Sequence, residues 1–342
     1  MRIALVAPAF GQTGGPEVVV QNLGQALADQ GVDVTLFAPA DWKTSLPLVP
    51  TLPQSLWSMK DFPKQSTRRR RNFIYGSQTV VLKHQEKFDV IHLHAQSSAY
   101  AIAKGARVPC VVTLHSGISK EDFGQMKESE LTLVGLTHSQ VGNLPVDTII
   151  GNGIPTAAIS PSFKAGEYLL AVGRLTTQKG IGQAIAIAKK SNKKLIIIGR
   201  IGISEDRQNY FKEYIEPHID GKQIRLIESV NREEIYDYFR KASFLVFPIM
   251  SQESNPLVPM EALACGTPVL GTRVAPLPEM FPKSEGAVLL SNDLEELAEA
   301  AAHPERFDRK TARRYAEQHL DSRRMADEYI ALYHKLIQSK KV

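Results

Sequence analysis

Short apolar runs alternate with amphipathic helical patterns along almost the whole chain, and this alternation constrains the fold most strongly. It is typical of parallel sheets with helices on both faces, because successive parallel strands need a helical crossover. We therefore predict an α/β protein with doubly wound parallel sheets. The predicted strands form two sets, 2–8, 32–38, 88–94, 108–115, 131–137 and 146–150, then 167–173, 194–199, 223–228, 243–248, 268–271 and 286–290.

The two sets of strands are separated by a segment, 153–166, that is rich in Pro, Ser and Ala and has no clear periodicity. Such a segment is typical of an interdomain linker, and 342 residues are enough for two domains. We predict two Rossmann-like domains facing a central cleft, with the ligand at the carboxyl ends of the strands. The predicted bounds are 1–160 and 161–318, and a helix in 319–342 is expected to pack back towards the first domain.

The composition argues against several classes of protein. Apolar residues make up 43% and charged residues 23%, as in ordinary soluble proteins. The net charge of +5 is too diffuse to predict nucleic-acid binding. Cys110 and Cys265 lie in apolar surroundings, which favours reduced core thiols. The N-terminus does not resemble a signal peptide and no apolar run is long enough to span a bilayer, so we expect a cytoplasmic protein.

The stretch SQESNPLVPMEALACGTPV contains two glutamates, Glu253 and Glu261, on either side of a predicted helix start. Ser254 or Asn255 is the expected N-cap, with Pro256 at the first helical position. Two carboxylates placed in this way could bind two parts of an elongated ligand at the helix N-terminus. The spacing alone favours the alternative interpretation, a solvated loop glutamate and a helix-surface glutamate.

Two cations, Arg174 and Lys179, follow the first strand of the second set, at the start of a helix predicted over 178–190. Cations beside a helix N-terminus suit a diphosphate, although solvated surface cations are the alternative. Carboxylates bind sugar hydroxyls well. Cations and carboxylates at the strand ends of one domain therefore point to a nucleotide sugar.

The loop after the first strand, PAFGQTGGPE, contains Gly14 and Gly15 just before a predicted helix. Two glycines would let the backbone approach a ligand at that helix N-terminus, but a tight turn explains them equally well. The loop is not G-x-G-x-x-G, which argues against a dinucleotide-dependent oxidoreductase. The other alternative, a non-catalytic two-lobed binding protein, would lack the paired cations.

In this order, the motifs resemble those of the family 4 retaining glycosyltransferases with the GT-B fold, over nearly the whole chain. A weaker resemblance, in 199–221, is to bacterial tetrahydrobiopterin glucosyltransferase-like sequences. The matching pieces are the GG loop, FDVIHLH (88–94), VVTLHSG (111–117), IIGNGI (149–154), GRLTTQKG (173–180) and the E-x7-E motif of Glu253 and Glu261.

The resemblance implies transfer of a hexose, glucose from UDP-glucose, with retention of configuration, to a small-molecule, glycan or lipid acceptor. It implies that Arg174 and Lys179 hold the donor diphosphate. Glu261 would bind the ribose, Glu253 the transferred sugar, and His115 would also lie near that sugar. No cofactor is implied beyond the donor substrate.

The resemblance also places Gly14, Gly15, Asn255, Leu257, Val258 and Val230 among the donor-binding residues. Many relatives have Glu-Gly-Phe-Gly-Leu where this chain has Glu-Ser-Asn-Pro-Leu, so Pro256 removes one N–H that could contact the donor. The segment 227–230 lacks the usual glycine near the base. The sequence therefore does not determine the base.

Metal binding is not expected. His92 and His94 lie in one predicted strand, and we expect only one of them to face the ligand, which argues against a two-histidine metal site. No Asp-x-Asp motif is present to anchor a catalytic divalent cation.

Four consecutive arginines, Arg68, Arg69, Arg70 and Arg71, lie in the first domain between confident strands. A solvated charged face is one interpretation. The other is a weak contact with an anionic acceptor or with the inner face of a membrane, where each basic residue contributes about 1 kcal/mol. Consecutive residues surround a helix, so at most two of the four could face one partner.

Overall fold

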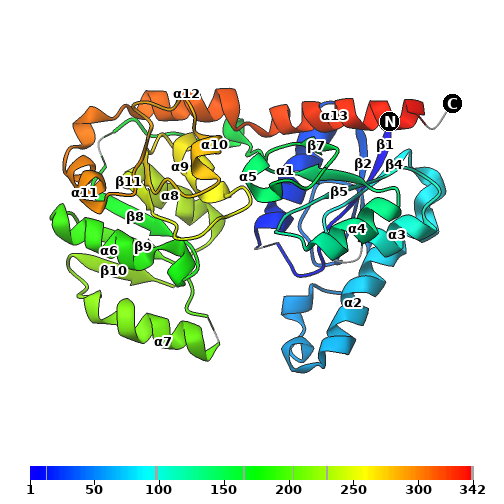
Figure 1. Ribbon diagram of the computed structural model, residues 1–342, viewed down its shortest axis with the longest axis horizontal. Coiled ribbons are helices and arrows are strands. Elements are labelled where there is room, and N and C mark those ends of the chain that lie inside the picture. Colours follow the sequence, from blue (N-terminus) through cyan, green and yellow to red (C-terminus); the bar gives the residue numbers. More distant parts are fainter. Residues whose placement is uncertain (13, 97–98, 165, 203, 229, 340–342) are drawn as a thin grey trace. The chain divides into compact units, whose positions relative to one another are not determined.

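The computed structural model describes residues 1–12, 14–96, 99–164, 166–202, 204–228 and 230–339. The chain forms two compact units (Figure 1). Unit 1 comprises Met1–Pro155 together with Ser322–Val342, and unit 2 comprises Thr156–Asp321. The chain therefore leaves unit 1, builds unit 2, and then returns to unit 1 for its last helix.

Unit 1 is built on a parallel sheet with the strand order β3-β2-β1-β4-β5-β6-β7. The order reverses between β1 and β4. The strand β3 was not predicted, because a three-residue run ending in proline gives no clear strand pattern. The strands are β1 (Arg2–Val6), β2 (Asp33–Ala38), β3 (Leu48–Pro50), β4 (Val90–Leu93), β5 (Cys110–Thr113), β6 (Thr132–Gly135) and β7 (Thr148–Ile149).

Helices connect most of these strands, as is usual for parallel pairing, whereas β2 and β3 are joined by 39–47 without a helix. Several short 3-10 turns lie between β3 and β4, at one end of unit 1 beside α2 (Figure 1). The helices of unit 1 are α1 (Gly15–Asp29), α2 (Thr67–Thr79), α3 (Ala99–Gly105), α4 (Lys120–Glu128), α5 (His138–Val141) and α13 (Ser322–Ser339).

Unit 2 has a second parallel sheet, ordered β10-β9-β8-β11-β12-β13, whose order reverses between β8 and β11. The predicted α/β class with two doubly wound parallel sheets is therefore confirmed. The strands are β8 (Tyr168–Val172), β9 (Leu195–Ile198), β10 (Ile224–Ile227), β11 (Ala242–Phe247), β12 (Val269–Gly271) and β13 (Val288–Leu290). The helices are α6 (Ile181–Lys190), α7 (Glu205–Tyr214), α8 (Arg232–Lys241), α9 (Leu257–Ala264), α10 (Leu277–Met280), α11 (Leu294–Ala302) and α12 (Arg309–His319).

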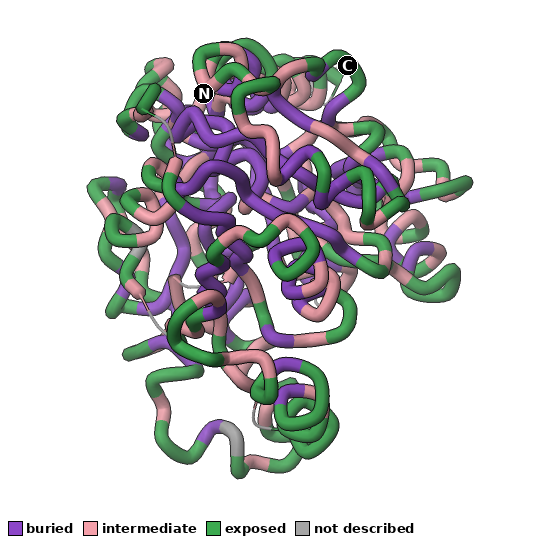
Figure 2. Tube along the Cα trace, turned by 90° about the vertical axis from the view of Figure 1, so that its left-hand side faces the viewer, coloured by how far each residue is buried: buried purple, intermediate pink, exposed green. Residues whose placement is uncertain are grey.

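The central strands of both sheets are buried along their whole length. Every residue of β4, β8 and β11 is buried, and these strands are mostly apolar. Continuous apolar runs are expected where helices cover both faces of a parallel sheet. Figure 2 shows buried residues concentrated on the inner segments and exposed ones on the outer loops and helices. Each unit thus has its own core, and its strand ends are held rigidly.

The last helix, α13, belongs to unit 1, where it packs against α1 (Figure 1). Its buried face includes Met325, Tyr329 and Tyr333, which lie on one side because they are about one helical turn apart. At its start, the backbone N–H of Ser322 donates to the carbonyl of Ile154. The two chain segments that join the units are therefore hydrogen-bonded to each other within unit 1.

Candidate functional site

In unit 2, the loops that follow β8 and β11 are bonded to each other. These strands are neighbours in the sheet, and the order reverses between them, which is where ligands bind in doubly wound folds. The N–H of Met250 donates to the carbonyl of Gln178 over 2.9 Å. The Nζ atom of Lys179 lies 2.5 Å from Oε1 of Glu253. The prediction that cations and carboxylates meet at the strand ends of one domain is confirmed for this pair.

Gly180 makes the close approach of the two loops possible. It has a φ of +66°, and a Cβ atom there would lie 1.8 Å from the carbonyl oxygen of Pro248. This left-handed residue separates a 3-10 turn, Thr177–Lys179, from α6. The helix predicted over 178–190 was therefore wrong at its start: α6 begins at Ile181, because Gly180 interrupts the helical backbone.

Lys179 is enclosed on several sides. Its side chain is 15% exposed and that of Glu253 is 20% exposed, and Nζ lies 5.5 Å from the centre of the Phe247 ring. Arg174 is exposed, and in the described part of the chain its side chain makes no hydrogen bond or ion pair. One of the two predicted cations is thus already neutralised, while the other remains available to an anion.

The helix that carries the second glutamate, α9, begins at Leu257 with Pro256 at the N-cap. The predicted cap at Ser254 or Asn255 was wrong by one or two residues, because Pro256 has an extended ψ of 133° and does not join the helix. Pro259 has no N–H, so Leu257, Val258 and Met260 supply the donors of the first turn. These backbone N–H groups form the positive end of the helix dipole.

Glu261 lies in the second turn of α9 and is only 8% exposed. Glu253 lies in the preceding loop, as predicted, and is paired with Lys179. The alternative of two solvated glutamates is therefore wrong. Asn255 is half-buried in the same loop, and Val230 is half-buried in the loop between β10 and α8.

In unit 1, the GG loop leads directly into α1, with Gly14 at the N-cap. A Cβ atom on Gly14 would lie 2.1 Å from Oε2 of Glu17, so glycine gives this carboxyl group its room. Glu17 is 5% exposed, and burial raises the pKa of its carboxyl group. Glu17 was not predicted, although its position two residues after the second glycine was a signal for it.

Three imidazoles are stacked near the carboxyl ends of β4 and β5. The ring centres of His92 and His94 lie 4.2 Å apart, and those of His94 and His115 lie 5.1 Å apart. Nδ1 of His94 is 2.8 Å from Nε2 of His115. The expectation that His92 and His94 would face apart was wrong, because side chains two residues apart share one face of a strand.

The innermost ring, His92, is bonded on both sides. Nδ1 lies 2.6 Å from the hydroxyl of Tyr333, and Nε2 lies 2.8 Å from the hydroxyl of Thr113. The Thr113 hydroxyl is in turn 2.6 Å from the hydroxyl of Tyr329. Two tyrosines of α13 therefore hold the base of the histidine stack.

Burial lowers the pKa of all three histidines. The pKa of His92 falls to about 3 and that of His115 to about 4, and the pKa of His94 lies well below its ordinary value. All three rings are therefore neutral at pH 7. Across the described ranges, no group of three His, Cys, Asp or Glu side chains is placed to hold a metal ion.

The arginine run lies at the start of α2. Arg68, Arg69 and Arg71 are exposed, whereas Arg70 is half-buried. The Nε atom of Arg70 is buried without a hydrogen-bond partner in the described part of the chain. The first turn of α2 contains no acidic residue, so its cations lie at the positive end of the helix dipole without compensation.

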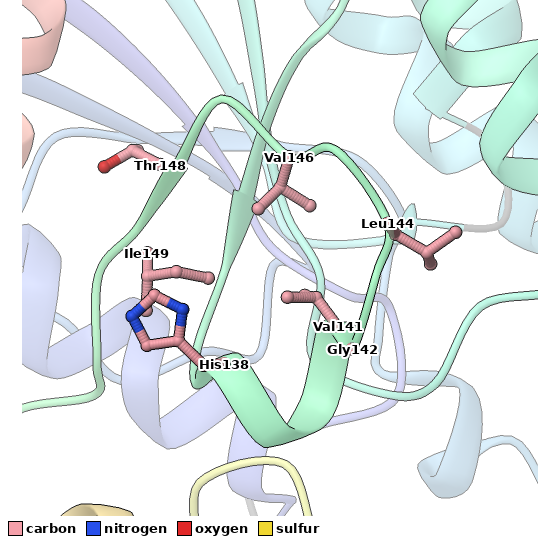
Figure 3. A pocket seen from close by; sticks show the side chains of 7 residues that line it. All are labelled: His138, Val141, Gly142, Leu144, Val146, Thr148 and Ile149. Atoms are coloured by element: carbon pink, nitrogen blue, oxygen red, sulfur yellow. The ribbon is translucent and has the colours of Figure 1, made fainter.

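A hollow of about 490 Å³ lies at the edge of the unit 1 sheet, between α5 and the segment leading into β7 (Figure 3). None of the predicted site residues lines it. Its lining consists of His138, Val141, Gly142, Leu144, Val146, Thr148 and Ile149. Within the part of the chain that the structure describes, no helix has the length and apolar character needed to cross a membrane.

Comparison with known proteins gives two matching family models. Residues 13–139 match the model described as Glycosyltransferase Family 4, and residues 156–319 match the model described as Glycosyl transferases group 1. The two matched ranges include the GG loop, His115, Arg174, Lys179 and both glutamates. They correspond to most of unit 1 and almost all of unit 2.

Curated relatives are similar over most of their length. The chain is 27% identical over 339 residues to a D-inositol 3-phosphate glycosyltransferase of Pseudarthrobacter chlorophenolicus, covering 79% of this chain and 76% of the relative. It is 26% identical over 326 residues to a phosphatidyl-myo-inositol mannosyltransferase of Propionibacterium freudenreichii, covering 84% and 81%.

Solved structures show the same fold at lower identity. Anabaena Alr3699/HepE, solved in complex with UDP and glucose, superposes with a TM-score of 0.75 at 16% identity, covering 98% of this chain and 100% of that one. The family models, the relatives and the two parallel sheets agree with one another. The chain belongs to glycosyltransferase family 4 and has the GT-B fold, with two Rossmann-like domains.

Proposed function

We propose that this glycosyltransferase moves a hexose, glucose from UDP-glucose, to a hydroxyl-bearing acceptor with retention of configuration. The observation that carries the proposal is the Lys179–Glu253 pair, beside the N-terminus of α9 and at the point where the strand order of unit 2 reverses. A cation, a carboxylate and free helix N–H groups are the chemistry that a nucleotide sugar needs: charge for its diphosphate and acceptors for its hydroxyls.

The donor diphosphate would bind Arg174 and Lys179. Transfer breaks the bond between the anomeric carbon and the diphosphate oxygen, and negative charge grows on the departing nucleotide. Stabilising charge that appears only in the transition state accelerates the reaction. Lys179 would swing from Glu253 towards the phosphate, since both partners are anions that compete for the same ammonium group.

The two glutamates would bind different parts of the donor. Glu261 is held rigidly within α9 and would accept hydrogen bonds from the ribose hydroxyls. Glu253 lies in the loop before the helix and would hold the transferred sugar, together with His115 of unit 1. Asn255 and the N–H groups of Leu257 and Val258 would contact sugar or phosphate oxygens. Val230 would pack against the base, and Gly14 and Gly15 would let the backbone approach the donor.

The acceptor class is supported by the relatives' names. One relative is named for D-inositol 3-phosphate and another for phosphatidyl-myo-inositol, and both of these compounds are polyols that carry a phosphate. We propose an acceptor of that chemistry, either free or attached to a lipid. The mannosyltransferase name keeps mannose as the second candidate for the transferred sugar.

A lipid-attached acceptor is favoured by the surface around α2. The uncompensated arginines there lie in the same part of unit 1 as Trp57, which is 61% exposed, and Tyr75, which is 44% exposed. The Trp57 ring packs against the rings of Phe10 and Phe62, with ring centres 5.3 Å and 5.9 Å apart. These contacts hold the exposed tryptophan in place. Cations and exposed aromatic rings suit an anionic lipid surface.

The proposal is tested by incubating the protein with UDP-glucose, GDP-mannose and other nucleotide sugars, each with inositol phosphate and with phosphatidylinositol vesicles. Glycosylated product and released nucleotide are measured in the presence and absence of EDTA. We expect transfer from UDP-glucose, with full activity in EDTA, since the cations already present can neutralise the diphosphate. Binding of every donor without transfer or hydrolysis would favour the non-catalytic alternative.

A further inference from the structure

The hydrogen bond between His94 and His115 has one donor and one acceptor, and the structure allows us to assign them. The two nitrogens, Nδ1 of His94 and Nε2 of His115, are 2.8 Å apart, and desolvation lowers the pKa of both imidazoles, so both are neutral at pH 7. A neutral imidazole has one N–H donor and one bare nitrogen. One of the two nitrogens in this contact must therefore carry the proton and the other must accept it.

The second nitrogen of the His94 ring, Nε2, indicates which of the two histidines is the donor. Nε2 of His94 is buried and has no hydrogen-bond partner among the described residues. If His94 accepted from His115, this Nε2 would carry a buried N–H with nothing to receive it. If His94 donates instead, Nε2 is only a bare lone pair. Orphaned N–H groups are the rarer of the two, because desolvating an unpaired donor is costly.

The donating arrangement fixes the protonation of His115 as well. Nε2 of His115 must accept, so its own hydrogen lies on Nδ1. No hydrogen bond to this Nδ1 is present in the described part of the chain, and the side chain is half-buried. We propose that His94 is a positioning residue that holds His115 as the Nδ1–H tautomer, so that His115 presents a neutral N–H donor to a substrate oxygen. This inference rests on the proposed contact of His115 with substrate.

The ring of His94 is prevented from turning over by its neighbours. His92 stacks on it at 4.2 Å, and His92 is itself held by the hydroxyls of Tyr333 and Thr113. His115 meets the edge of the His94 ring, because Nδ1 of His94 lies 2.8 Å from Nε2 of His115 and the two ring centres are 5.1 Å apart. One face of the His94 ring is therefore covered by His92, and its Nδ1 is directed at His115.

The tautomer is read directly by long-range ¹H–¹⁵N correlation spectra of the full-length protein labelled with ¹⁵N-histidine. We expect the spectra to show His115 with a bare Nε2 and a protonated Nδ1, and His94 with a bare Nε2. A protonated Nε2 on His115 would overturn the inference. This readout needs no substrate and no activity, so it stands even if the proposed function fails.

Two substitutions at His94 separate positioning from packing. Asparagine places an amide nitrogen near the Nδ1 position and can still donate, whereas phenylalanine keeps the stacked ring and cannot. We expect His94→Phe to move the proton of His115 to Nε2 and to lower kcat/KM about tenfold. His94→Asn should keep both the tautomer and most of the activity.

A matched control comes from the base of the stack. Tyr333→Phe removes a hydroxyl that contacts His92 and neither of the other rings, so the His115 tautomer should not change. If His94→Phe changes the tautomer of His115 but has the kcat/KM of the wild type, His94 does not act by making His115 present an N–H donor to the substrate. His115→Ala with full turnover would instead remove the proposed contact of His115 with substrate.

Discussion

Lys179 and Glu253 form a 2.5 Å ion pair although they come from loops that follow different strands, β8 and β11. Neither side chain is more than one fifth exposed, so the pair is shielded from much of the solvent that weakens surface ion pairs. This carboxylate is the anionic partner of the ammonium group. In the proposed function, a diphosphate would have to replace it.

Removing each cation in turn should therefore give different results. Arg174→Ala should weaken UDP binding about ten- to a hundredfold, because a charge-assisted hydrogen bond contributes roughly 1.5–3 kcal/mol. Lys179→Ala should lower turnover more than it weakens UDP binding, since Lys179 exchanges one anion for another when the nucleotide binds. Isothermal titration with UDP and steady-state kinetics measure the two effects.

The matched control for both is Lys222→Ala, which removes an exposed cation just before β10, at the amino edge of the unit 2 sheet. This variant should bind UDP as the wild type does. If Arg174→Ala and Lys179→Ala also match the wild type in affinity and turnover, the diphosphate does not bind at this strand edge.

The two glutamates should separate nucleotide binding from sugar transfer. Glu261→Gln should weaken binding of UDP itself, because the ribose is present with or without a sugar. Glu253→Gln frees Lys179 from its ion pair, so UDP should bind more tightly while transfer falls. Titrations with UDP and with UDP-glucose are compared for both variants; the same change in both curves would refute the division of roles.

The buried histidines should make the fold sensitive to acid. In the unfolded chain a histidine takes up a proton near pH 6.5, whereas the folded pKa is about 3 for His92 and about 4 for His115. Between pH 6.5 and 4 the unfolded state binds more protons, so the free energy of unfolding falls as pH falls. Each such histidine contributes about 1.4 kcal/mol per pH unit in that window.

Urea unfolding at pH 7, 6 and 5 tests this acid sensitivity. His92→Leu should show a shallower dependence on pH than the wild type, whatever its stability at pH 7. His334→Gln, at an exposed position of α13, should keep the wild-type dependence. If the His92→Leu slope equals that of the wild type, His92 is not a source of the acid sensitivity.

The arginines of α2 should govern any attachment to lipid. Replacing 68–71 with glutamine should abolish sedimentation with anionic vesicles and leave UDP affinity unchanged. Binding of the wild type should also weaken as salt rises, because exposed charges are screened. If the glutamine variant sediments with vesicles as the wild type does, the four arginines are only a solvated charged surface. The control variant changes the same number of cations in unit 2, Lys189, Lys190, Lys193 and Lys194, to glutamine.

The strands were the most predictable part of the fold. Buried parallel strands such as β8 and β11 are continuous apolar runs, and their pattern is carried by their own residues. The meeting of Lys179 and Glu253 was predictable for the same reason, since each follows such a strand. The start of α6 was not, because it depends on the contact between Gly180 and Pro248, which lie far apart in the sequence.

The histidine stack was not predicted from the sequence for a related reason. The strand periodicity itself places His92 and His94 on one face, because they are two residues apart. The hydrogen bonds at the base of the stack could not be predicted, because they join residues that are far apart in the sequence: Tyr333 is 241 residues from His92, and Tyr329 is 216 residues from Thr113. Only tertiary packing brings these groups together.

The return of α13 to unit 1 has a consequence for synthesis on the ribosome. Thr113 and His92 leave the ribosome early, but the tyrosine hydroxyls that pair with them are translated only after the whole of unit 2, Thr156–Asp321. At roughly 5–20 residues per second, that interval is on the order of ten to thirty seconds. During it, His92 and Thr113 can bond to each other but not to the two tyrosines, so the final stability of unit 1 depends on a helix that is made after unit 2.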